Sequence, residues 1–431
     1  MKTTGMIPLC LPAIVLWMCS ARTVQAQGDF ETYFEPKSLR IDFALSGNRA
    51  SQSAALVQLR EEPVWAGTVK NCTDPFNYGG YYINVYAKDR KLIYSRGFNT
   101  LFEEWRTTDG ALTQTQSWTN SISVPYPAQT VQVELLARER STQRFVSLMT
   151  LEVDPQSISI DRSPLPSLQT VELQTKGLPA EKVDLVFLPE GYTEAEMDKF
   201  DADARRFTEA LFRTPPYDRR ADDFNVRAVH LPSAESGVDL SGRGIYRQTA
   251  LNAGFYTFGI DRYLTTRDMK SIRDAVWNVP CDAIFILVNS DLYGGGGMYN
   301  FYAIGTADNE RTVRVFVHEL GHSFAGLADE YFQSEVAYND FYDLGAEPWE
   351  PNITTLVDFD RKWKDLLAAD TPVPTPAEAP YADKVGVFEG GGYLEKGIYR
   401  PADHCTMRDM SGFCPVCQRA ILQMIDFMTG K

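Results

Sequence analysis

The chain lacks an excess of basic residues. Its 431 residues include 42 lysines and arginines against 57 aspartates and glutamates, a formal net charge of −15. Such a surface repels phosphate backbones, so the charge argues against nucleic acid as a partner. A composition of 44% hydrophobic and 23% charged residues is that of a folded soluble protein, long enough for two domains.

Long hydrophobic runs are also missing. The apolar run at residues 6–18 falls short of the ~20 residues that cross a bilayer, so we expect no transmembrane segment. Lys2 precedes this run and Val-Gln-Ala ends at residue 26, which predicts a secretory signal peptide at residues 1–26. The protein is therefore expected to be secreted, periplasmic or at the cell surface. Lipid attachment at Cys19 is an open alternative.

The cysteines do not form a complete set of pairs. Without the signal peptide five remain, which are Cys72, Cys281, Cys405, Cys414 and Cys417. The last two form a C-x-x-C motif, typical of a redox centre or half of a zinc site, but the sequence has no second C-x-x-C. Because exported chains favour disulfides, we predict a local bridge that involves Cys405, Cys414 or Cys417.

A strand-rich region occupies residues 28–162. Apolar and polar residues alternate there, as at Val131, Val133 and Leu135, which is the period of strands with one wet face. Turn-rich stretches such as NYGG and TTDG separate the strands. We predict an all-β sandwich, and an accessory role for it.

A different pattern follows a proline-bearing linker and fills residues 176–431. The apolar run VDLVFLP at residues 183–189 is typical of a strand buried on both faces. Thr193 and Glu196 have the spacing of a helix capping box, and apolar residues follow at helical intervals. The second region is therefore predicted to be an α/β domain.

Two of the chain's four histidines lie close together in the stretch VHELGHSFAGLADEY, residues 317–331. The motif H-E-x-x-H comprises His318, Glu319 and His322. On a helix with about 100° per residue, an apolar stripe forms on one side and both imidazoles lie on the other. Two such imidazoles can bind one metal ion, with the glutamate beside the open coordination position. We predict that His318 and His322 bind Zn²⁺ and that Glu319 is the catalytic general base.

A catalytic zinc ion needs a third protein ligand, with the fourth position left for water. Gly326 can end the helix in a left-handed conformation and turn the chain back toward the imidazoles. Asp329 follows this glycine by three residues, the offset of the third ligand in H-E-x-x-H-x-x-G-x-x-H, although one extra residue precedes the glycine here. Asp329 is the predicted third ligand, and Glu330 and His404 are the alternatives.

With these motifs and the segment FEGGGYLEKGIYRPADHCTM, residues 388–407, the chain resembles metzincin-type zinc metallopeptidases, in particular the IgA-peptidase family. The resemblance covers most of residues 176–431. It implies a metzincin-like peptidase domain with a methionine beneath the metal, here Met407, and an accessory domain before it. Tyr331 and Tyr399 are the candidates for a tyrosine that assists the reaction in some relatives.

The predicted function is that of a secreted zinc-dependent endopeptidase, which hydrolyses protein or peptide substrates with metal-activated water. The glycine run at residues 294–297 lacks the Lys-Ser/Thr ending of a phosphate loop and is expected to border the substrate groove. The alternative function is a non-catalytic surface protein that binds a glycan or a protein through the β-sandwich. The sequence indicates neither the natural substrate nor an oligomeric state.

Overall fold

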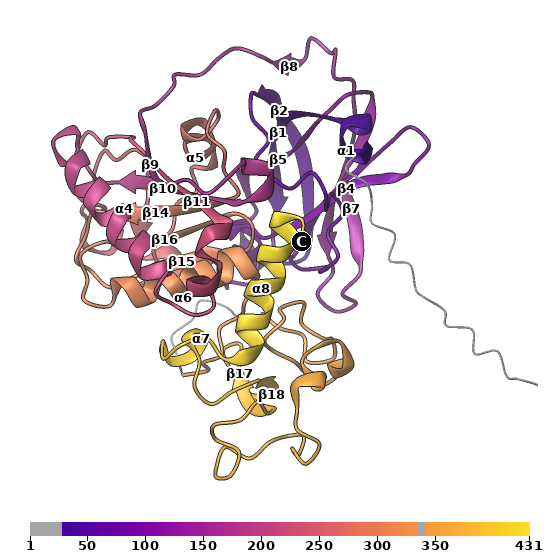
Figure 1. Ribbon diagram of the computed structural model, residues 1–431, viewed down its shortest axis with the longest axis vertical. Coiled ribbons are helices and arrows are strands. Elements are labelled where there is room, and N and C mark those ends of the chain that lie inside the picture. The colour runs from indigo at the N-terminus through magenta and orange to yellow at the C-terminus, as the bar shows by residue number, and fades with distance from the viewer. Residues whose placement is uncertain (1–27, 334–340) are drawn as a thin grey trace, which may run out of the picture.

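The computed structural model describes residues 28–333 and 341–431. The predicted signal peptide at residues 1–26 lies outside them. Along the described chain, no helix combines the length and apolar character that spanning a bilayer requires. Figure 1 shows the strand-rich amino-terminal region beside a second sheet with its helices, and the segment around β17 and β18 below both.

Two four-stranded sheets form the amino-terminal region, with the orders β5-β1-β2-β8 and β4-β3-β6-β7. Their strands are β1 (Phe34–Gly47), β2 (Gln52–Glu62), β3 (Tyr81–Tyr86), β4 (Leu92–Phe98), β5 (Gln116–Pro127), β6 (Val131–Arg138), β7 (Phe145–Val153) and β8 (Ile160–Asp161). As the alternation predicted, every second residue of β6 is buried. The ring centroids of Phe43 on β1 and Phe98 on β4 are 6.2 Å apart, and the two sheets face each other across a shared core.

A mixed six-stranded sheet is the centre of the second region, with the order β15-β16-β14-β10-β11-β9. Its strands are β9 (Thr170–Gln174), β10 (Val183–Glu190), β11 (Phe224–Val229), β14 (Ala283–Val288), β15 (Gly295–Met298) and β16 (Tyr302–Thr306). The four central strands are parallel, whereas β9 and β15 at the edges are antiparallel to their neighbours. Every residue of β10 is buried, as predicted for a strand covered on both faces.

Alternate residues of β10 face two different cores. The long helices of the second region are α4 (Met197–Leu211), α6 (Thr312–Ala325) and α8 (Pro415–Thr429). Leu185 and Phe187 pack in one cluster with residues of these helices. Val186 and Leu188 belong to the cluster that also fills the space between the amino-terminal sheets. The two regions are therefore joined by one continuous core.

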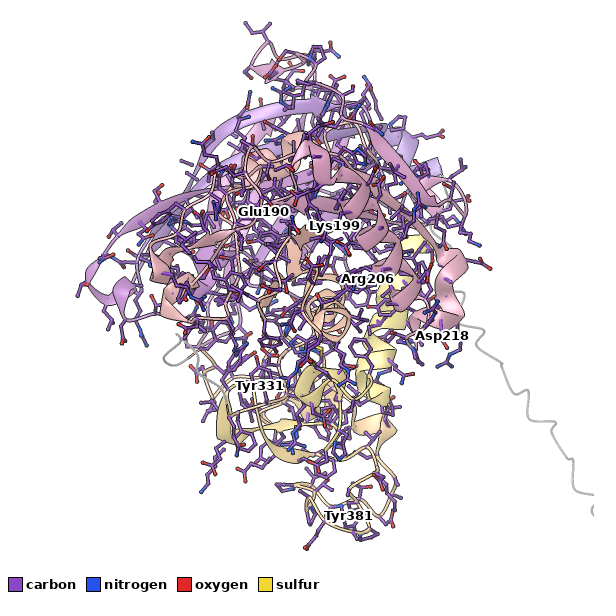
Figure 2. The ribbon with its side chains drawn as sticks, turned by 90° about the vertical axis from the view of Figure 1, so that its left-hand side faces the viewer. Glu190, Lys199, Arg206, Asp218, Tyr331 and Tyr381 are labelled. Atoms are coloured by element: carbon purple, nitrogen blue, oxygen red, sulfur yellow. The ribbon has the colours of Figure 1, made fainter. Side chains whose placement is uncertain are left out.

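The remaining elements are short. They are α1 (Gly28–Tyr33), α2 (Leu101–Trp105), α3 (Gly110–Thr113), α5 (Met269–Ala275), α7 (Thr406–Asp409), β12 (Asp239–Leu240), β13 (Gly254–Phe255), β17 (Phe388–Gly391), β18 (Leu394–Arg400) and the 3₁₀ turns η1 (Pro179–Glu181), η2 (Glu194–Glu196), η3 (Tyr217–Asp223), η4 (Ser241–Arg243), η5 (Thr257–Gly259), η6 (Phe359–Arg361) and η7 (Lys364–Leu366). Figure 2 shows Tyr381 near the tip of the segment that carries β17 and β18, and Tyr331 where this segment meets the rest of the molecule.

Sheets thus fill the amino-terminal region, and a sheet with long helices fills the second, as predicted. The capping box of Thr193 and Glu196 is formed at the turn that leads into α4. The boundaries at residues 162 and 176, and the finer assignments of a sandwich and of a metzincin-like fold, stay predictions.

Candidate active site

Helix α6 carries the H-E-x-x-H motif, and the burial of its apolar side fixes its orientation. Phe316 and Leu320 are buried in the core beneath the helix. The ring centroids of Phe316 and of Phe285 on β14 are 4.7 Å apart. The motif residues on the opposite side line a pocket. Gly326 ends the helix with a φ of 66°, the left-handed conformation predicted for it.

Backbone carbonyls hold both imidazoles of the motif. Nδ1 of His318 lies 3.0 Å from the carbonyl oxygen of Thr406, and Nδ1 of His322 lies 2.6 Å from that of Leu327. Because a carbonyl oxygen only accepts, each Nδ1 donates its proton and each Nε2 is left as the ligand atom. The two Nε2 atoms are 3.1 Å apart, and two lone pairs at that separation repel unless a positive charge lies between them.

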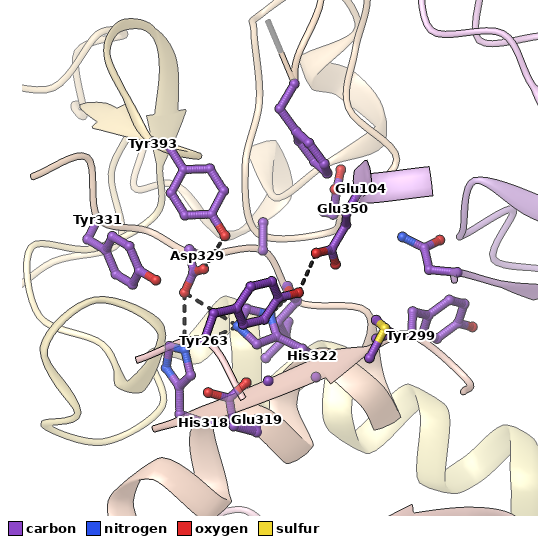
Figure 3. A pocket seen from close by; sticks show the side chains of 18 of the residues that line it. Glu104, Tyr263, Tyr299, His318, Glu319, His322, Asp329, Tyr331, Glu350 and Tyr393 are labelled. Carbon is purple, nitrogen blue, oxygen red and sulfur yellow. Dashed lines mark hydrogen bonds and ion pairs between the residues drawn. The ribbon is translucent and has the colours of Figure 1, made fainter. Parts of the chain in front are cut away.

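Asp329 completes a triangle of ligand atoms with the two imidazoles (Figure 3). Its Oδ1 lies 3.1 Å from Nε2 of His318 and 3.4 Å from Nε2 of His322. Ligand atoms about 2.0–2.1 Å from one tetrahedral zinc ion lie roughly 3.4 Å from each other, so the triangle fits one ion. The other oxygen, Oδ2, accepts a hydrogen bond of 2.5 Å from the hydroxyl of Tyr393.

The carboxylate and the imidazoles of this triangle shift one another's pKa values. Burial lowers the pKa of the His322 imidazole, but the Asp329 carboxylate beside it prevails and raises this pKa to about 9. Burial raises the pKa of the Asp329 carboxyl, yet the two imidazoles hold it well below its usual range. The pocket therefore stabilises positive charge where the three ligand atoms converge, as a cation site requires.

Neither alternative third ligand takes the place of Asp329. Glu330 groups with three cysteines instead, and its Oε1 accepts a hydrogen bond of 2.9 Å from Asn352. The His404 side chain is 68% exposed, and its Nδ1 pairs with Asp409 at 2.6 Å. The geometry thus favours Asp329, although the ligand role of all three predicted residues stays a prediction.

Glu319 lies beside the imidazoles on the pocket wall. One of its carboxylate oxygens is within 4.8 Å of an imidazole nitrogen of each histidine. Burial raises the pKa of its carboxyl, and the nearby histidines act against this rise. A raised pKa brings a carboxylate closer to the operating pH, which suits a general base.

Both regions of the chain build the walls of the pocket. Asn99 and Glu104 come from the amino-terminal region, and the glycines of β15 come from the edge of the six-stranded sheet. Tyr263 donates a hydrogen bond to the Glu104 carboxylate, which ties the two regions together at the pocket (Figure 3). The amino-terminal region therefore contributes residues to the pocket itself.

The structure separates the two tyrosines that the sequence offered. Tyr331 lines the pocket, whereas Tyr399 lies on β18, opposite Glu389, and does not. Tyr393, which contacts Asp329, was missed although it lies in the segment FEGGGYLEKGIYRPADHCTM. Its only sequence signal is the glycine-rich turn around it, where Gly392 adopts a positive φ.

Met407 is fully buried and lies against α6. A Cβ added to Gly321 would be only 2.9 Å from its Sδ, so the helix and this methionine approach closely at that glycine. The preceding residue, Thr406, supplies the carbonyl that holds His318. Packing of Met407 beneath the helix thus helps to position an imidazole.

Gly297 allows α6 to approach β15 closely. A Cβ at this position would lie 2.4 Å from the backbone oxygen of Glu319 and 3.0 Å from Cβ of His322. We expect Gly297→Ala to lower the free energy of unfolding by about 1–3 kcal/mol, measured by urea unfolding, because strand and helix must move apart. Gly110→Ala is the control, since its nearest neighbour would be 3.7 Å away. Equal stability of the two variants would contradict the close approach.

Family models match most of the chain. The model described as IgA Peptidase M64 matches residues 171–379 and 377–425, and the one described as Peptidase M64 N-terminus matches residues 29–148. A search of curated proteins finds no match. The two family models follow the division between the strand-rich region and the region of the six-stranded sheet.

Proposed function

Since this chain belongs to the IgA peptidase M64 family, we propose that it is an exported zinc-dependent endopeptidase with Glu319 as its general base. Family membership makes it a peptidase, which acts on protein or peptide substrates. The observation that carries the zinc assignment is the triangle of ligand atoms from His318, His322 and Asp329. Export rests on the signal-peptide pattern of residues 1–26.

The same proposal includes the finer fold assignments. Residues 28–162 are proposed to be a β-sandwich accessory domain and residues 176–431 a metzincin-like peptidase domain. The facing sheets of the amino-terminal region and the helix α6 beside the edge strand β15 support these assignments.

The four site residues divide two tasks in the proposed reaction. His318, His322 and Asp329 would hold the zinc ion, which supplies a Lewis acid for the water and the peptide carbonyl. Glu319 accepts a proton from the water whose oxygen attacks the scissile carbonyl carbon. When the carbon–nitrogen bond breaks, Glu319 gives that proton to the departing amine, so one carboxylate serves both halves of the reaction.

Tyr331 is the proposed donor to the carbonyl oxygen as it becomes negatively charged. Its ring stacks on that of His318 with centroids 6.5 Å apart, and Arg262 forms a hydrogen bond with its hydroxyl. A phenol held in place by a cation is a fixed donor, and such preorganised hydrogen bonds stabilise developing charge.

The substrate is proposed to bind as an extended peptide beside β15. This strand is the edge of the six-stranded sheet, and its glycines line the pocket. An edge strand offers main-chain donors and acceptors to a peptide without demanding a particular sequence. Part of this edge is already used, because Gly295 accepts a hydrogen bond of 3.4 Å from the backbone of Leu264.

A chelator experiment tests the proposed function. We expect the purified protein to contain zinc and to digest casein or a peptide library. Removal of metal should stop hydrolysis, and added zinc should restore it, because the catalytic ion binds reversibly. Hydrolysis that is insensitive to a strong chelator would contradict the zinc assignment. Failure of the metal-loaded protein to cut any peptide would favour the alternative of a non-catalytic surface binding protein.

A further inference from the structure

Three cysteines and one glutamate meet in the interior behind the candidate active site. Cys405 precedes α7, Cys414 precedes α8, and Cys417 lies in the first turn of α8. One ligand atom of each cysteine and one carboxylate oxygen of Glu330 all lie within 4.8 Å of one another, and all four residues are buried. The local disulfide predicted from the sequence is absent, because none of the five cysteines in the described chain is bonded to another.

The spacing of the four side chains is that of metal ligands. The sulfurs of Cys405 and Cys417 are 3.6 Å apart, and the Cys417 sulfur is 3.2 Å from Oε1 of Glu330. Two sulfurs about 2.3 Å from one tetrahedral zinc ion lie roughly 3.8 Å apart, whereas a disulfide requires about 2.05 Å. The observed sulfur separation matches the first arrangement and not the second.

Glu330 gives an independent reason for a cation at this place. Its side chain has no exposed surface, and within the described residues its Oε2 has no hydrogen-bond partner. A buried carboxylate oxygen without a partner is costly. A disulfide would use two of the three sulfurs and would leave this oxygen and the third thiol as they are. One divalent cation satisfies all four groups, and the buried guanidinium of Arg400 adds positive charge nearby.

We propose that Glu330, Cys405, Cys414 and Cys417 bind a structural zinc-type cation, at a second site separate from the H-E-x-x-H motif. The C-x-x-C motif at the start of α8 supplies two ligands at the spacing that structural zinc sites use. The half of a zinc site that the sequence showed is completed by Cys405 and by a glutamate from a distant segment. No open coordination position remains, which is typical of a structural ion.

This second site would hold the catalytic residues in position. Glu330 follows Asp329 directly, and its backbone N–H donates to the carbonyl of Met407 at 2.8 Å. Cys405 precedes Thr406, whose carbonyl accepts from Nδ1 of His318 at 3.0 Å. The ion would therefore tie together the two segments that orient one imidazole and the third ligand of the first site.

Cobalt substitution in the intact protein tests the second site without relying on activity. We expect wild-type protein to bind two equivalents of zinc, and a His318→Ala/His322→Ala double variant to keep one. When Co²⁺ replaces the zinc of that variant, thiolate-to-cobalt charge-transfer absorption should appear, because only the cysteine site supplies sulfur ligands. Absence of this absorption, or complete loss of bound metal from the variant, would overturn the proposal.

Cysteine variants provide the complementary measurement. Cys414→Ser/Cys417→Ser should lose one equivalent of zinc and the charge-transfer absorption, and should unfold at a lower temperature. The matched control, Cys72→Ser/Cys281→Ser, changes two cysteines outside the cluster and should keep both equivalents. If the first pair does not fold, the histidine double variant decides alone. A disulfide between two of Cys405, Cys414 and Cys417, located by peptide mapping of wild-type protein that is alkylated as it is denatured, would also overturn the proposal.

Discussion

Glu319→Gln is expected to lower kcat for peptide hydrolysis by about 10²–10⁴-fold, the range that general acid–base catalysis usually contributes. Glutamine keeps nearly the same shape but cannot take a proton from water, so zinc content and unfolding temperature should stay close to those of the wild type. Kinetics on a quenched fluorescent peptide give kcat and KM separately, and the loss should appear in kcat.

Glu310→Gln is the matched control for this variant. Glu310 lies just before α6 with a side chain that is 85% exposed, so the same chemical change is made close by but outside the pocket. Its kcat should equal that of the wild type. If Glu319→Gln also retained wild-type kcat, another group would have to accept the proton and the proposed mechanism would fail.

Asp329→Asn should weaken zinc binding at the first site by at least about 100-fold, because loss of a ligand costs no less than loss of a residue that supports one. The substitution removes the negative charge that raises the pKa of His322 and that offsets the charge of a bound cation. Peptidase activity should fall with it and should be partly restored by excess zinc. Competition with a chelating dye measures the affinity directly.

His404→Asn distinguishes Asp329 from the more distant alternative ligand. His404 is mostly exposed and paired with Asp409, so its replacement should change neither zinc affinity nor turnover. The opposite pattern, with a loss in His404→Asn and none in Asp329→Asn, would reassign the third ligand. In the cobalt experiment the Asp329→Asn protein should keep its sulfur-based absorption, which separates damage at the first site from damage at the second.

Local periodicity predicted the elements that carry the motif. The apolar stripe of α6 follows from residues at helical spacing, and Phe316 and Leu320 are indeed buried against the sheet. Gly326 ends the helix because its left-handed φ is one that glycine adopts without strain. The apolar run in the sequence of β10 is continuous because both faces of that strand are covered. Each of these signals lies within a few residues of the feature it predicts.

Contacts between distant segments could not be predicted in this way. Tyr393 reaches Asp329 from a turn beside β18, and Glu104 reaches the pocket from the amino-terminal region. Neither residue belongs to a helical or strand pattern in the sequence that would mark it as part of the site. For the same reason the sequence predicted a disulfide among these cysteines and not a cluster with Glu330, which joins them only through the tertiary fold.

The core that the amino-terminal sheets share with the second region limits where the chain can be divided into separate fragments. A fragment that began after the strand-rich region would leave the side of α5 that packs on β5 without its cover. Apolar surface of this kind promotes aggregation. The amino-terminal region is therefore a permanent folding partner of the second region, and exchanging it for an unrelated module would require a redesigned surface around α5 to receive it.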